Sequence, residues 1–85
     1  MNPYTFRTII EPDVKGFHGY VPALKGCHTW GKTIIETRQH LREAIQVYCE
    51  SLVKHGQRIS RDESFETHET IDIQGAAHGR SLRYA

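Results

Sequence analysis

The sequence has few cysteines and no long apolar run. Its 85 residues include only two cysteines, Cys27 and Cys49. Secreted domains of this size usually carry several disulfides, so we expect two free thiols in a reducing compartment. No apolar stretch approaches the roughly 20 residues that span a bilayer, and the first residues lack the basic and apolar regions of a signal peptide. The sequence therefore predicts a cytoplasmic protein.

The chain also lacks an excess of charge of either sign. Eleven Lys and Arg residues stand against ten Asp and Glu residues, which gives a formal net charge of +1. A protein that attracts nucleic acid through its overall field needs a clear cationic excess. We therefore expect no direct DNA binding. The length fits one domain with a small core, so association with a partner would add stability.

Short strand patterns occupy the first third of the chain. They are rich in β-branched and aromatic residues. The segments between them, at 11–16 and 22–26, contain Pro and Gly, which favour turns. Gly19 lies within the second pattern, which indicates a bulge or a close backbone approach. Short connections favour an antiparallel meander. Three strands are expected, over residues 4–10, 17–21 and 27–30.

One amphipathic helix follows. Thr33 and Glu36 match a capping box, in which each side chain satisfies the backbone amide of the other residue. Gly56 suits the position just after the end of a helix. Between these limits one apolar stripe recurs at helical spacing. Its members are Ile34, Leu41, Ile45, Tyr48 and Leu52.

The pattern weakens after the helix. Residues 65–73 alternate well enough to predict a fourth strand, at an edge of the sheet. Residues 74–85 lose any pattern and are expected to form a flexible tail outside a domain of residues 1–73. The fold class predicted is α+β, in the order β-β-β-α-β, with a small antiparallel sheet and the helix packed on one face. The free edges of such a sheet favour a homo-oligomer, a dimer or tetramer.

No cluster of residues predicts catalysis or a cofactor. Cys27 and His28 are neighbours on one strand, so their side chains point to opposite faces and cannot easily form a joint site. The six histidines match no zinc-binding spacing, which favours solvated or cross-strand roles for them. Carboxylates grouped for two-metal hydrolysis are not evident either. We expect a non-enzymatic protein without a metal.

The run over residues 19–33 reads Gly-Tyr-Val-Pro-Ala-Leu-Lys-Gly-Cys-His-Thr-Trp-Gly-Lys-Thr. It resembles the signature of the HicB-like antitoxin family, in which a glycine-aromatic strand leads to a Val-Pro-x-Leu-x-Gly-Cys turn. The resemblance extends over residues 4–73. Lys25 departs from it, because the family usually has proline there, and the turn is expected to be less rigid.

The resemblance implies a truncated ribonuclease H fold and a small HicA-like ribonuclease toxin as partner, neutralised by occlusion. Many family members also carry a C-terminal DNA-binding module. Only twelve residues follow Ile73, too few for such a module, so we do not expect one here. Two alternatives stay open: a stand-alone oligomeric HicB-like scaffold or regulator, and a degenerate ribonuclease H-like RNA-binding protein.

Tyr20 and Trp30 are the candidate residues of a partner interface. Trp30 is the only tryptophan, and tryptophan is enriched among the residues that dominate binding energy. The alternative for Trp30 is packing in the core beneath the helix. The sequence alone does not decide between the two.

Overall fold

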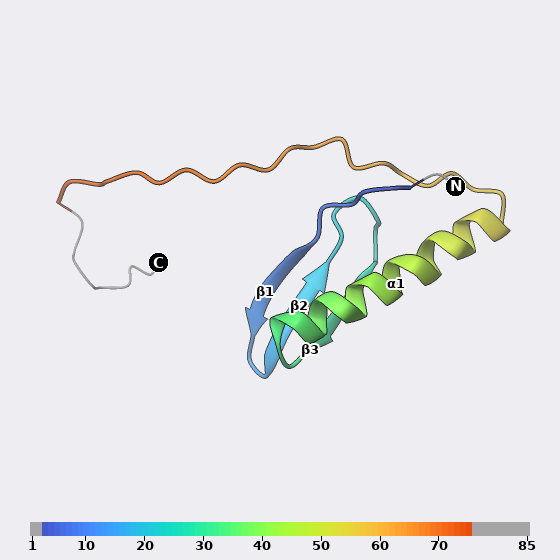
Figure 1. Cartoon of the computed structure of the whole chain (residues 1–85), viewed down its shortest axis with the longest axis horizontal. Helices are drawn as coiled ribbons and strands as arrows, with labels where there is room; N and C mark the ends of the chain where they lie inside the picture. Colours follow the sequence, from blue (N-terminus) through green and yellow to red (C-terminus); the bar gives the residue numbers. More distant parts are fainter. Residues whose placement is uncertain (1–2, 76–85) are drawn as a thin grey trace.

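A small antiparallel sheet and one long helix form the body of the protein. The computed structural model describes residues 3–75. The sheet has the order β1-β2-β3, and α1 crosses one of its faces (Figure 1). The predicted α+β class is confirmed. The elements are β1 (Ile9–Asp13), β2 (Gly16–Tyr20), β3 (His28–Gly31) and α1 (Ile34–Lys54).

The first hairpin lies later in the chain than the sequence pattern indicated. Val14 and Lys15 alone connect β1 to β2, so Pro12 belongs to the strand and lies opposite Phe17. The predicted strand over residues 4–10 and the loop over residues 11–16 are wrong in their bounds. Proline is tolerated at this place because β1 is an edge strand, where a missing amide leaves no ladder bond unmade.

A tight connection links β2 to β3. The Val21 amide donates to the Cys27 carbonyl at 3.1 Å, and the Cys27 amide donates to the Leu24 carbonyl at 3.0 Å. Gly26 adopts a φ of 81°, which few other residues tolerate. The loop thus folds inward and places Leu24 in the core, with 2% of its surface exposed.

The helix begins and ends where the sequence predicted. Thr33 is the N-cap, and its hydroxyl accepts from the Glu36 amide at 3.0 Å. The return bond differs from the prediction, because the Glu36 carboxylate accepts from the amide of Lys32 at 2.6 Å. At the other end Gly56 has a φ of 70°, and the Gln57 amide donates to the Leu52 carbonyl at 2.8 Å. This 6→1 bond is the Schellman pattern.

The core lies between α1 and the sheet. Its buried members are Val21, Leu24, Cys27 and Leu41, with Thr37 also fully buried. The predicted stripe is right from Leu41 onward, but Ile34 is 55% exposed. Thr37 takes the sheet-facing position in this part of the helix because it fits the narrow gap left by glycines below it.

Residues 57–75 form an extended arm, which first passes beside the N-terminal segment and then leaves the body (Figure 1). The predicted fourth strand over residues 65–73 is absent from the described part of the chain, because no neighbouring strand lies beside it to form a ladder. Most of the predicted tail falls in residues 76–85, outside the described residues. Within residues 3–75 no helix is long and apolar enough to cross a membrane.

Candidate partner-binding surface

The sheet has two different faces. A Cβ built on Gly19 or Gly31 would meet side chains of α1, so these glycines face the helix. Because side chains alternate along a strand, their neighbours face the opposite way. Four aromatic or imidazole side chains therefore gather on the face away from α1, and we call them the outer cluster. Its members are His18, Tyr20, His28 and Trp30.

The rings of the outer cluster contact one another across two strands. His18 pairs with Trp30 and Tyr20 with His28 in the β2–β3 register. The ring centroids of His18 and Trp30 are 4.8 Å apart, those of His28 and Trp30 are 5.1 Å apart, and those of His18 and Tyr20 are 5.7 Å apart. Aromatic pairs at such distances add about 0.5–1.5 kcal/mol beyond the area they bury. The cluster is thus held together by its own contacts.

Asp13 fixes the orientation of Trp30. The indole Nε1 donates to Asp13 Oδ2 at 3.0 Å, and the other carboxylate oxygen accepts from the Val14 amide at 2.6 Å. The bond from Val14, followed by that from Trp30, lowers the pKa of the Asp13 carboxyl below its ordinary value of 3.8. The carboxylate is therefore charged at neutral pH. Trp30 is held in place although 51% of its surface is exposed.

The structure brings the two predicted interface residues together. His18 contacts both Tyr20 and Trp30, so all three lie in one patch. Core packing of Trp30 beneath the helix is wrong, since its ring lies on the opposite face and is half exposed. His18 and His28 were not among the predicted interface residues; for the histidines the sequence favoured a solvated or cross-strand role. The spacing of positions 18, 20, 28 and 30 on two paired strands was the signal for the cluster.

Cys27 and His28 lie apart, as the strand geometry requires. Cys27 is buried in the core, and His28 is exposed in the outer cluster. Burial, with a smaller contribution from Cys49, raises the pKa of the Cys27 thiol above 9.0, so it is neutral at physiological pH. Both cysteines are free. Among residues 3–75, no group of three or more His, Cys, Asp or Glu side chains is placed to hold a metal ion.

A model of a known family matches residues 6–77, most of the chain, and its description is HicB_like antitoxin of bacterial toxin-antitoxin system. The chain belongs to the HicB-like antitoxin family. Its matched residues include all three strands, the helix and the extended arm.

Relatives of this HicB-like chain occur in both bacteria and archaea. A UPF0150 protein of Thermoplasma acidophilum is 45% identical over 62 residues, which cover 72% of this chain and 90% of the relative. A UPF0150 protein of Synechocystis sp. is 36% identical over 61 residues, covering 71% of this chain and 77% of the relative. These proteins share most of their length with the chain.

A solved structure also resembles this HicB-like chain. One chain of the HicA3 and HicB3 toxin-antitoxin complex matches with a TM-score of 0.61 and 29% identity, over 72% of each chain. The similarity therefore covers sequence and fold together. It relates the small sheet and helix described above to a member of a toxin-antitoxin assembly.

Proposed function

We propose that this HicB-like chain is an antitoxin that binds a small HicA-like ribonuclease toxin and neutralises it by occlusion. The observation that carries the proposal is the similarity, in sequence and in fold, to a chain of the HicA3 and HicB3 complex. Membership in the antitoxin family supports it. On this proposal the chain covers the active surface of the toxin and performs no chemistry of its own.

The outer cluster is the proposed contact surface. Aromatic side chains that bury against a partner dominate many interfaces, and tryptophan and tyrosine are the most enriched among them. Trp30 is exposed yet already oriented by Asp13 and by its ring contacts. A preorganised anchor loses little conformational entropy on binding, which favours affinity. We therefore assign Tyr20 and Trp30 to the interface, with His18 and His28 beside them.

Co-expression tests the function. The full chain is co-expressed with a candidate HicA-like toxin, and growth and co-purification are measured together. We expect the chain to restore growth and to purify as a complex with the toxin. Persistent toxicity without a complex would show that the chain is not an antitoxin for that partner.

The interface assignment has a separate test. Truncating a central tryptophan costs about 2 kcal/mol or more, which corresponds to roughly 30-fold in Kd. We expect Trp30→Ala to weaken toxin binding by this factor in calorimetry. Val47→Ala is the matched control, because Val47 is a similarly exposed apolar residue on α1, 66% exposed. Equal binding by the two variants would place the interface elsewhere.

A further inference from the structure

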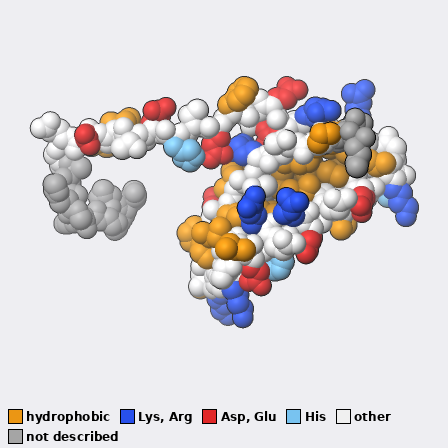
Figure 2. All heavy atoms as spheres, viewed as in Figure 1, with side chains coloured by type: hydrophobic (Ala, Val, Ile, Leu, Met, Phe, Trp, Pro, Cys, Tyr) orange, Lys and Arg blue, Asp and Glu red, His pale blue; other side chains and the backbone are white. Residues whose placement is uncertain are grey.

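The extended arm carries an apolar face that no other part of residues 3–75 covers. Phe65 is 95% exposed, Ile71 is 74% exposed and Ile73 is 71% exposed. All three occupy odd positions, so in an extended chain they share one face, together with Thr67 and Glu69. The even positions of this segment are all polar or charged. Figure 2 shows apolar side chains exposed along the arm. The segment has the pattern of a half-buried strand without the sheet that would bury it.

The arm does not fold back onto its own sheet. The radius of gyration is 17.0 Å, whereas a compact chain of this length has about 12 Å. The longest dimension is 55 Å against 29 and 20 Å for the others. Extended apolar segments need a neighbouring strand for stability in water. Within residues 3–75 the chain supplies no such neighbour.

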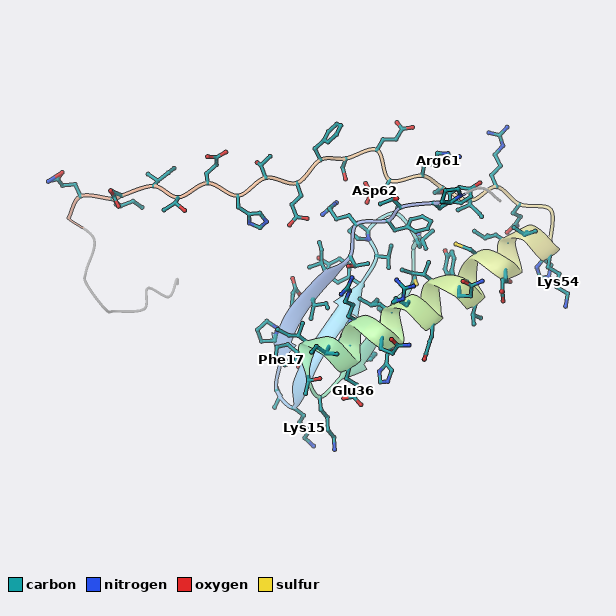
Figure 3. The ribbon with its side chains drawn as sticks, in the orientation of Figure 1. Lys15, Phe17, Glu36, Lys54, Arg61 and Asp62 are labelled. Atoms are coloured by element: carbon teal, nitrogen blue, oxygen red, sulfur yellow. The ribbon has the colours of Figure 1, made fainter. Side chains whose placement is uncertain are left out.

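The root of the arm is fixed, which sets the direction in which it leaves. The Arg7 amide donates to Asp62 Oδ2 at 3.3 Å, and Arg7 Nε donates to Ser64 Oγ at 3.2 Å. Arg61 lies 4.6 Å from the centre of the Tyr4 ring. Residues 61–64 thus run parallel to residues 4–7, and the chain departs after them (Figure 3).

The sheet has one edge that can accept a strand. At the β3 edge, His40 Nδ1 donates to the Trp30 carbonyl at 2.7 Å, and α1 packs more extensively over β3 than over β1. Within residues 3–75, no strand pairs with the outer edge of β1. Beside the segment that leads into β1 lies an open hollow of about 380 Å³. It is lined by the apolar side chains of Phe6, Leu41 and Ile45 and by polar ones, among them Arg38, Arg42 and Gln46.

We propose that residues 65–73 of one copy add as a strand to the β1 edge of a second copy, and that the exchange is reciprocal. The apolar face with Ile71 and Ile73 would then turn toward α1 of the partner copy and cover the hollow near Ile45. The polar face would remain in water. A reciprocal exchange forms a closed two-fold dimer, the commonest symmetry of small oligomers. This dimer does not depend on the proposed toxin.

The mass of the full chain in solution is the first measurement. Light scattering after size exclusion should give twice the 9.8 kDa of one chain. The double variant Ile71→Asp/Ile73→Asp places charges on the apolar face and should give a monomer. The control His68→Asp/Thr70→Asp adds the same number of acidic residues to the polar face and should remain a dimer. A monomeric natural chain, or equal masses for both variants, would overturn the proposal.

A second measurement uses the unaltered chain and does not rely on variants that could misfold. In dimers mixed from labelled and unlabelled copies, isotope-filtered NOEs should connect the Ile71 and Ile73 methyls to β1 of the other copy. NOEs confined to one copy would show that the arm folds back, which contradicts exchange. If the chain is monomeric and residues 65–73 gain hydrogen-exchange protection only when the co-purified toxin is added, the arm's neighbour is the toxin and the dimer is wrong.

Discussion

Gly31 and Thr37 lie in direct contact, with no room for a side chain between strand and helix. A Cβ at Gly31 would lie 2.7 Å from the Thr37 amide nitrogen, closer than a Cβ atom approaches other heavy atoms in real proteins. Gly19 allows a second close approach, since its Cβ would lie 2.7 Å from Leu41 Cδ1. The helix can therefore rest on the backbone of β2 and β3 at these two glycines, and the rings of the outer cluster point to the other face.

This contact predicts different costs for two alanine substitutions. At Gly31 the obstacles are the Thr37 hydroxyl and the helix backbone at Thr37. The backbone cannot move without shifting α1, so Gly31→Ala should lower the free energy of unfolding by about 3 kcal/mol. At Gly19 the obstacles are ends of the Leu41 and Thr37 side chains, and Gly19→Ala should cost about 1 kcal/mol. Urea denaturation measures both. Equal losses would contradict the proposed difference between backbone and side-chain obstacles.

The helix cap gives a second prediction. The Thr33 hydroxyl satisfies the Glu36 amide, so Thr33→Ala should lower the free energy of unfolding by about 1 kcal/mol. Thr33→Ser keeps the hydroxyl and is the matched control, with a loss well below that of alanine. Thermal denaturation followed by circular dichroism reports both changes. A serine variant as unstable as the alanine variant would assign the effect to the lost methyl group.

The hydrogen bond between Asp13 and Trp30 can be followed by fluorescence, because Trp30 is the only tryptophan. Asp13→Ala removes the acceptor and should make the indole more mobile, with lower fluorescence anisotropy and faster quenching by acrylamide. Glu11→Ala is the control, since it removes a carboxylate from the same strand without a bond to the indole. Unchanged quenching in Asp13→Ala would show that the ring contacts alone hold Trp30.

The contact between Asp62 and Arg7 at the root of the arm should be lost at acidic pH. Hydrogen bonds from the Ser64 side chain and amide, and then the Arg7 amide and charge, lower the pKa of the Asp62 carboxyl below its ordinary 3.8. A lowered folded-state pKa means that the contact contributes fully above pH 3.8 and is lost as the pH falls through the lowered value. The Arg7 amide chemical shift should report this transition. In Asp62→Asn the transition should disappear; its persistence would assign it to another carboxyl.

Local chemistry explains how much of this fold the sequence could predict. The cap at Thr33, the stop at Gly56 and the tight turn at Gly26 depend on residues within a few positions, so they are visible in the chain itself. The bounds of the first strand could not be predicted in this way. Proline usually indicates a turn, and Pro12 can belong to a strand only because that strand lies at an edge of the sheet. The sequence named Tyr20 and Trp30 separately as interface residues. Only the pairing of β2 with β3 shows that they form one patch with His18.

The sequence by itself determined the α+β class, the limits of the helix and the family, because caps, turns and motifs are set by neighbouring residues. Only the tertiary structure decided that Thr37 replaces Ile34 against the sheet, since the space between Gly31 and the helix is a property of packing. The tertiary structure also decided that residues 65–73 do not form a strand in the described chain. Their alternation predicts a strand, but a strand forms only where a second strand lies alongside, and the described part of a single chain does not provide one.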